Sequence, residues 1–212
     1  MNTYSRYVII VLHLGADMAR VIEYDPQEVL EKTMALFWNK GYEATSIQDI
    51  VAATGLKPGS IYAAYTNKEG MFKAVVDLYT SNSLKMITAV LTKDGDVLQN
   101  IHDFLTMVIV DVIAEEEHNG CLLVKTLLVA SHKDERVQQQ IAGFYKSMEP
   151  VLVTALQKAK DEGVTNVDVD VFANFIISTV FGSHVHYKTF KDINVPKQNV
   201  AILMDTLTQK KD

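Results

Sequence analysis

The sequence predicts an all-α fold, in which a small three-helix N-terminal domain with a helix-turn-helix is joined to a larger helical domain. Apolar residues recur at the three- and four-residue spacing of amphipathic helices along most of the chain. Residues that favour helix starts, such as Asp25 and Pro26, precede these segments, and glycines follow several of them. The one alternation of period two, at Val167, Val169 and Val171, is interrupted by aspartates. We therefore expect no β-sheet.

Composition excludes several classes of protein. The chain has 212 residues, of which 48% are hydrophobic and 22% charged, as in an ordinary globular protein. Its formal net charge of −6 provides no global attraction to nucleic acid or anionic membrane, so any DNA-binding surface must be local. A single cysteine forbids an internal disulfide and fits a cytoplasmic location.

The first 17 residues are predicted to form a separate N-terminal extension. The apolar run from Val8 to Leu14 is far shorter than the roughly 20 residues that span a bilayer, and it lacks the flanks of a signal peptide. Met18 opens a polar segment that would make a natural start. Our hypothesis is that residues 1–17 are an extended reading of the gene and add nothing to function.

The first three helices are expected to carry the helix-turn-helix. A helix from Pro26 ends at Gly41, and Thr45 or Ser46 caps a second, shorter one. Gly55 closes that helix by adopting the left-handed conformation. Pro58 then lets a third short helix begin at once and continue to Tyr65. Two short helices joined by a glycine-containing turn are the helix-turn-helix arrangement.

The larger domain is predicted to contain a series of longer helices. The spacing of apolar residues places them at 68–91, 97–112, 121–131, 134–162, 167–190 and 196–209. No repeat or low-complexity linker separates the segments, which favours tight packing between them.

The helix-turn-helix carries the chemistry of a local DNA-binding surface. No acidic residue occurs between Ile50 and Lys68, whereas Lys57 and Lys68 flank the hydroxyl groups of Ser60, Tyr62, Tyr65 and Thr66. Gly59 removes a side chain where the third helix would approach a duplex. Ser60 offers a hydroxyl to a base edge or a phosphate at the N-terminus of this helix.

The segment from Thr45 to Glu69 closely resembles the TetR family of bacterial transcriptional repressors, and residues 37–45 match the end of that family's first helix. The strong resemblance covers residues 26–75. It implies a DNA-binding domain at residues 18–69 and a domain for effector binding and dimerisation at 70–212. It also implies a homodimer that represses transcription from a palindromic DNA operator and is released by a small-molecule inducer. Activation in place of repression stays open.

The resemblance also assigns contacts to DNA. It implies that Tyr62 and Lys68 contact phosphates and that Thr45 and Ser46 lie where the second helix meets the backbone of the duplex. At Pro58, Ala63 and Ala64 relatives often carry larger polar or aromatic side chains, which favours methyl contacts and shape readout over hydrogen bonds to bases. The full expected contact set is Thr45, Ser46, Lys57, Pro58, Gly59, Ser60, Tyr62, Ala63 and Lys68.

Cys121 follows Gly120 at the start of an apolar helix and has two interpretations. The ordinary one is a small buried hydrophobe. The other is a sensing thiol, because unpaired N–H groups at a helix N-terminus favour the thiolate, with Lys125 as a partner one turn later. Some TetR-family repressors that respond to electrophiles or oxidants carry a cysteine in a similar setting, so the resemblance allows this role.

Adaptable and aromatic side chains of the larger domain are candidates for an effector pocket between helices. The candidates are Phe104, Met107, Cys121, Phe144, Tyr145 and Met148. His184 and His186 are two residues apart on a helix and cannot chelate a metal together. We expect them at an interface or on the surface, and we expect no metal site and no cofactor.

The last two helices carry more apolar residues than an isolated terminal pair can bury, which predicts a four-helix interface between two copies of the chain. The expected interface residues are Phe172, Phe175, Ile176, Thr179, Val180, Ile202, Leu203 and Leu207, with Val171 on the same helix.

Two other classes of protein compete with a regulator. A constitutive architectural DNA-binding protein needs no cavity, whereas the large apolar second domain favours ligand sensing. An all-α enzyme needs either a thiol with a base beside it or a di-iron site. Only Glu115 to His118 has the spacing of a di-iron ligand pair, so the count fails. We expect neither enzymatic activity nor a membrane partner.

Overall fold

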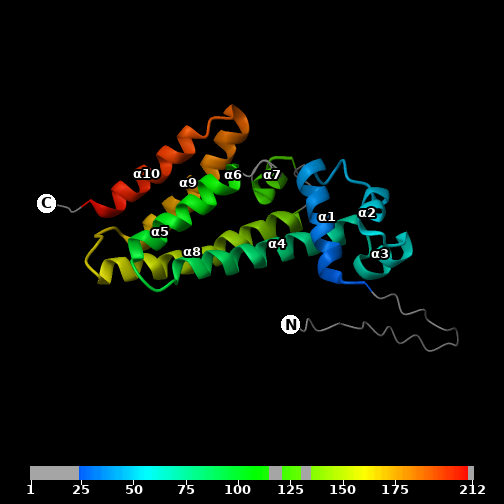
Figure 1. The fold of residues 1–212 in the computed structure, drawn as a ribbon, viewed down its shortest axis with the longest axis horizontal. Helices are drawn as coiled ribbons and strands as arrows, with labels where there is room; N and C mark the ends of the chain where they lie inside the picture. The colour runs from blue at the N-terminus through cyan, green and yellow to red at the C-terminus, as the bar shows by residue number, and fades with distance from the viewer. Residues whose placement is uncertain (1–23, 115–120, 130–134, 210–212) are drawn as a thin grey trace.

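The computed structural model describes residues 24–114, 121–129 and 135–209, and the described chain is helical with no strand (Figure 1). The proposed extension at residues 1–17 and the Glu115 to His118 segment lie outside the described residues. Helices α1 to α3 form a compact group at one end of the molecule, and the remaining helices form an elongated bundle beside it (Figure 1).

The helix-turn-helix forms where its capping residues predict. Helix α1 (Pro26–Lys40) starts after Asp25, whose side chain accepts a hydrogen bond from the Gln27 N–H. Helix α2 (Ile47–Thr54) begins with a complete capping box between Ser46 and Asp49, and Gly55 ends it in the left-handed conformation at φ 73°. Helix α3 (Pro58–Tyr65) follows directly.

Helix α4 (Lys68–Leu91) belongs to both hydrophobic cores. Its first half adds Phe72 and Val76 to the N-terminal core, which also contains Ile50 and Ile61. Its second half adds Ile87 and Leu91 to the core of the larger domain. The expected division between residues 69 and 70 therefore falls in the first turn of a helix that continues through both cores.

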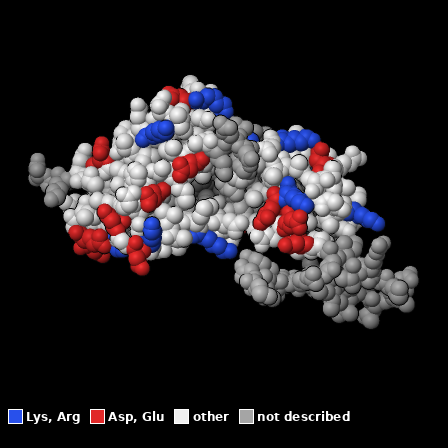
Figure 2. Space-filling model, in the orientation of Figure 1, with Lys and Arg blue, Asp and Glu red and all other residues white. Residues whose placement is uncertain are grey.

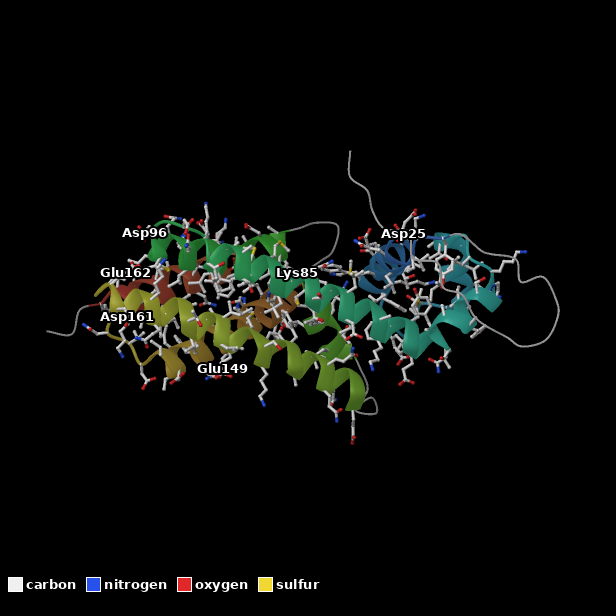
Figure 3. All side chains as sticks on the ribbon, turned by 90° about the horizontal axis from the view of Figure 1, so that it is seen from below. Asp25, Lys85, Asp96, Glu149, Asp161 and Glu162 are labelled. Carbon is white, nitrogen blue, oxygen red and sulfur yellow. The ribbon has the colours of Figure 1, made fainter. Side chains whose placement is uncertain are left out.

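The larger domain is a bundle of long helices. It contains α5 (Val97–Thr106), a π-helical segment η1 (Met107–Asp111), α6 (Val112–Ala114), α7 (Leu122–Val129), α8 (Glu135–Asp161), α9 (Val169–Phe190) and α10 (Asn194–Thr208). Helix α8 packs against α4 and α9, and α10 packs against α9 (Figures 1 and 3).

The predicted helix at residues 97–112 is interrupted by η1, where the Val112 N–H bonds to the Met107 carbonyl five residues earlier. The stretch from Val97 to Ala114 is long and apolar enough to cross a membrane by length and composition. Its side chains Ile101, Phe104 and Leu105 are buried in the core, as expected of a central helix in a folded domain.

Helix α7 is the second connection to the helix-turn-helix. Its side chains Leu122 and Leu123 pack in the N-terminal core, together with Ile141 of α8. The Lys125 ammonium donates a hydrogen bond to the Trp38 carbonyl of α1. The expectation that Lys125 partners the Cys121 thiol is therefore wrong, because this side chain extends toward the end of α1 instead.

Gly70 is required by the close contact between the end of α3 and the start of α4. A Cβ atom at this position would lie 2.0 Å from the Tyr65 carbonyl oxygen. We expect Gly70→Ala to lower the free energy of unfolding by about 1–3 kcal/mol, measured by denaturant titration. Gly143→Ala is the matched control, because a Cβ in that exposed part of α8 meets nothing within 4 Å. It should raise the same quantity by about 0.5–1 kcal/mol. Equal effects of the two substitutions would contradict the steric role of Gly70.

Candidate functional site

The outer side of α3 forms an exposed surface of small and hydroxyl-bearing side chains, which we call the recognition surface. It comprises Lys57, Pro58, Gly59, Tyr62 and Ala63, all of them exposed. Ile61, which points the other way, is fully buried. The fold therefore presents this side of α3 to a partner and anchors it from behind.

Two features of the recognition surface suit close approach by a phosphate backbone. A Cβ on Gly59 would meet nothing within 4 Å, so no contact within the described part of the chain requires a glycine there. Helix α3 also begins without a side-chain cap, since Lys57 at its N-cap makes no capping hydrogen bond. Uncapped N–H groups at the start of a helix attract anions. Ser60 lies half-buried in the same turn.

Three other residues expected to contact DNA have structural partners. Ser46 is exposed and caps α2. Lys68 is half-buried, and its ammonium donates to the Tyr42 carbonyl at 3.0 Å and lies 4.4 Å from the centre of the Tyr42 ring. Thr45 is only 1% exposed, and its hydroxyl donates to the Gly41 carbonyl at 2.7 Å. Thr45 is thus a buried cap of the α1–α2 turn, and its hydroxyl is not offered to a duplex.

The charges of the chain leave the recognition surface free of carboxylates. Asp96, Asp161 and Glu162 lie at the end of the molecule farthest from α1 to α3 (Figure 3), and the space-filling view shows a large group of carboxylates at that same end (Figure 2). Asp49, which is close in sequence to the recognition surface, forms an ion pair with Lys40, with 2.7 Å between Nζ and Oδ2. Hydrogen bonds from Lys40 and Ser46 hold the pKa of Asp49 well below its usual range.

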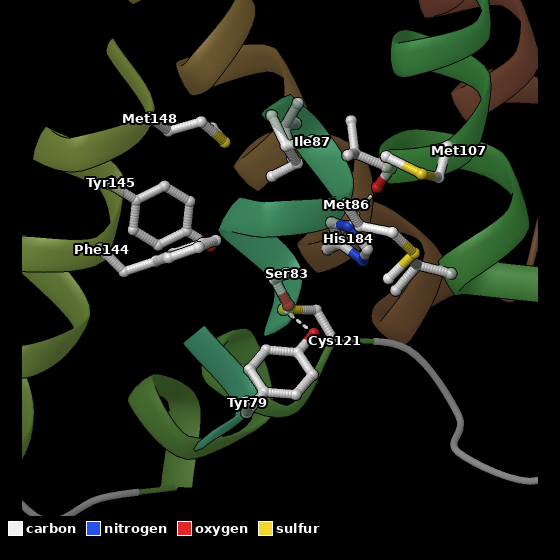
Figure 4. Close-up of a pocket in the computed structure, with 13 residues that line it drawn as sticks. Tyr79, Ser83, Met86, Ile87, Met107, Cys121, Phe144, Tyr145, Met148 and His184 are labelled. Carbon is white, nitrogen blue, oxygen red and sulfur yellow. Dashed lines mark hydrogen bonds between the residues drawn. The ribbon is translucent and has the colours of Figure 1, made fainter. Parts of the chain in front are cut away.

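A cavity lies in the larger domain, between α4, α8, α9 and the η1 segment (Figure 4). Its volume is about 70 Å³. Among the described residues, no charged side chain lines it. The lining residues are Tyr79, Ser83, Met86, Ile87, Met107, Val108, Val112, Cys121, Phe144, Tyr145, Met148, Val180 and His184.

The structure brings five of the six expected pocket residues to this cavity: Met107, Cys121, Phe144, Tyr145 and Met148. Phe104 is not among the lining residues and is fully buried in the core of the larger domain. The residues of α4 on the wall went unrecognised in the sequence, because the amphipathic pattern of a helix does not say which part of its buried face meets empty space.

Cys121 lies on the wall of the cavity beside two tyrosines. Its sulfur is 3.6 Å from the Tyr79 hydroxyl (Figure 4). Burial raises the pKa of Tyr79 and of Tyr145 well above the usual range, and the adjacent thiol adds to both shifts. Both phenols are therefore neutral hydrogen-bonding groups. Tyr79 also packs edge-on against Trp38 of α1, with ring centres 5.2 Å apart.

His184 lines the cavity from α9, contrary to its expected place at an interface or on the surface. It is 6% exposed, and its Nε2 lies 2.8 Å from the Val108 carbonyl of η1. Burial lowers the pKa of His184. Phe172, Ile176 and Val180 recur every four residues, and His184 is the next position in this series. The periodicity of α9 could therefore have predicted that His184 is buried.

The expected dimer residues divide into two groups. Phe172, Ile176, Val180, Leu203 and Leu207 are buried within the chain's own core, so they are not available to a partner. Phe175 and Ile202 are about half exposed, and Thr179 is partly exposed. Val171, expected on the same helix, is exposed too, and the structure adds exposed Val185. Among the described residues, no three His, Cys, Asp or Glu side chains gather where they would hold a metal ion.

Comparisons with known proteins agree with this architecture. Residues 29–75 match the family model described as "Bacterial regulatory proteins, tetR family". Residues 98–203 match the model described as "Tetracyclin repressor-like, C-terminal domain". Together the two matches cover the helix-turn-helix and most of the larger domain.

The chain is similar to several transcriptional regulators. It is 28% identical over 165 residues to the HTH-type transcriptional repressor ComR of Escherichia coli, covering 76% of this chain and 79% of ComR. It is 25% identical over 193 residues to the uncharacterised HTH-type transcriptional regulator YezE of Bacillus subtilis, covering 90% of this chain and all of YezE.

Solved structures share the fold. A cysteine-substituted TetR family regulator CifR, complexed with 26-base-pair double-strand operator DNA, superposes with a TM-score of 0.76 at 21% identity, covering 89% of this chain and all of CifR. The reduced form of E. coli NemR gives a TM-score of 0.79 at 15% identity, covering 87% of this chain and 98% of NemR. With both domains matched in order, the chain belongs to the TetR family of bacterial regulatory proteins and is a DNA-binding transcriptional regulator.

Proposed function

We propose that this regulator is a dimeric repressor that binds a palindromic operator through the recognition surface and is released by a small molecule in the cavity. The observation that carries the proposal is the exposed, acid-free side of α3, which joins the Lys57 ammonium to an uncapped helix start and a glycine with open space around it. A duplex supplies the phosphates that such a surface lacks within the chain. Action on DNA implies a cytoplasmic location, and this function requires neither catalysis nor a cofactor.

A continuous uncharged line on α9 supports the dimer. Val171, Phe175, Ser178, Gly182 and Val185 are all exposed and recur at alternating spacings of four and three residues. This is the spacing of a helix that packs along another helix. A Cβ on Gly182 would meet nothing within 4 Å, which leaves room for a second backbone. Exposed Ile202 extends the apolar surface onto α10.

A two-fold dimer follows the symmetry of a palindromic operator. Two copies joined through α9 and α10 present two α3 helices related by the same axis, so each reads one half-site. Few side chains of the recognition surface carry hydrogen-bonding groups suited to base edges. We infer that positions read through DNA shape and thymine methyl groups supply part of the selectivity.

Release is proposed to act through contacts that join the cavity to α1. Tyr79 lies on the cavity wall and packs against Trp38, and Cys121 precedes α7, which packs in the N-terminal core. A molecule that displaces either group changes the support of the helix-turn-helix. A constitutive architectural protein would need no such connection between a cavity and its DNA-binding domain.

A second route of release is favoured by the position of Cys121 on the cavity wall. Its sulfur faces a space that a small electrophile can enter, and addition of any group there would push against Tyr79. Thiol modification would then act through the same contacts as a bound ligand.

Gly59→Ala tests the recognition surface. We expect binding to DNA from the region upstream of the regulator's own gene to weaken by roughly tenfold or more, because a methyl group separates α3 from the duplex. Fluorescence anisotropy at fixed salt, with random DNA as control, measures this. The unfolding free energy should rise by about 0.5–1 kcal/mol, since alanine favours the helix. Unchanged affinity would contradict a close approach at Gly59.

Phe175→Lys tests the dimer. A lysine in the middle of the uncharged line brings an unpaired charge into the interface, so we expect the dimer to dissociate to monomers in analytical ultracentrifugation. Thr92→Lys, at the exposed end of α4, is the control, and this variant should sediment as the same dimer as the unsubstituted chain. Dimers that persist in Phe175→Lys would place the interface elsewhere.

Cys121→Ser tests the second route of release. Cys121 is the only cysteine, so N-ethylmaleimide acts on one thiol. We expect the reagent to release the unsubstituted chain from operator DNA and to leave Cys121→Ser bound, with equal affinities in its absence. Equal release of both proteins would remove Cys121 from the mechanism.

A further inference from the structure

His184 holds a hydrogen-bond acceptor that nothing in the described part of the chain satisfies. A carbonyl oxygen only accepts hydrogen bonds, so the contact between Nε2 and the Val108 carbonyl places the ring proton on Nε2. The neutral ring then leaves Nδ1 as an acceptor. This atom is buried and has no hydrogen-bond partner among the described residues.

The π-helical segment η1 explains how His184 is held in this orientation. In a regular helix the Val112 N–H would bond to the Val108 carbonyl, but in η1 it bonds to the Met107 carbonyl. The Val108 carbonyl accepts from His184 of α9. The tautomer and the ring orientation are therefore fixed by backbone geometry before any ligand arrives.

The rest of the wall defines the chemistry that surrounds the His184 acceptor. Among the described residues, no Lys, Arg, Asp or Glu lines the cavity, so a charged ligand would lose its hydration without finding a partner on this part of the wall. Met86, Met107 and Met148 provide flexible apolar contacts, and Phe144 and Tyr145 provide aromatic ones (Figure 4). The burial that lowers the pKa of His184 keeps its ring uncharged, which matches a neutral ligand.

We propose that the cavity binds a small neutral molecule with an apolar, ring-sized body and one hydroxyl or N–H group, which donates a hydrogen bond to His184 Nδ1. The cavity of about 70 Å³ is about half of the roughly 150 Å³ that holds benzene in an engineered core, so binding of a ring requires the flexible methionine side chains on the wall to move aside. The proposal rests on the effector role given to the cavity above, and it adds the chemical class of the effector.

The test compares two ring-sized probes of the same shape, 4-fluorophenol and 4-fluorotoluene, by fluorine NMR titration of the full chain without DNA. The ratio of the two dissociation constants cancels general effects of a mutation on the cavity. We expect His184→Phe to shift this ratio by about tenfold against 4-fluorophenol, because the acceptor is lost while a ring remains. His186→Phe is the matched control, since His186 lies on the same helix but does not line the cavity, and it should leave the ratio unchanged.

A second measurement needs no variant. In the unsubstituted chain labelled with ¹⁵N-histidine, 4-fluorophenol should shift the Nδ1 resonance of one of the six histidines, and 4-fluorotoluene should shift none. A ratio unaffected by His184→Phe, or no binding of 4-fluorophenol to the unsubstituted chain, would overturn the proposal. Binding that depends on His184 but leaves the chain on operator DNA would support the ligand class and contradict the effector role.

Discussion

The structure depends on the sharing of α4 between two hydrophobic cores. Phe72 and Val76 hold its first half among the helices of the helix-turn-helix, and Ile87 and Leu91 hold its second half in the larger domain. A helix that is buried at both ends transmits a change at one end as a change in position at the other, because packed cores resist continuous deformation. The pairing of Tyr79 with Trp38 lies where the two halves meet.

Helix α7 provides a second connection between the larger domain and the helix-turn-helix. Leu122 and Leu123 pack in the N-terminal core, and Cys121 just before them lies on the wall of the cavity. Cavity and helix-turn-helix are thus joined by two separate elements, one of them part of a long rigid helix and the other a short one. In the release proposed above, regulation requires a difference in how well a ligand fits two arrangements of these contacts.

The local distribution of charge matters more for this molecule than its total charge. The chain is acidic, and carboxylates lie over α1 as well as at the far end of the larger domain (Figure 2), but none occurs between Ile50 and Lys68, and Asp49 of α2 is paired with Lys40. The cavity has the opposite character, since its described wall is uncharged and its polar groups are neutral phenols, a hydroxyl, a thiol and a histidine with a fixed tautomer. The partners proposed for the two surfaces therefore differ in the interaction that selects them: phosphate attraction at α3, and apolar contact with one directed hydrogen bond in the cavity.

The sequence by itself determined the helices and the identity of the DNA-binding element, because these depend on local interactions. Asp25, Ser46 and Gly55 act through hydrogen bonds and backbone conformations within a few residues, so α1 and α2 were predicted to within a residue at most ends. The tertiary structure alone decided which apolar positions line a cavity, which stay exposed and which fill the core. Phe104 and Met107 have the same helical spacing as other core residues, and Phe172 and Phe175 are equally apolar, yet the members of each pair lie in different environments. The orientation of His184 likewise depends on a contact between α9 and η1, since His184 and Val108 lie 76 positions apart in the chain, and periodicity along one helix does not encode such a contact.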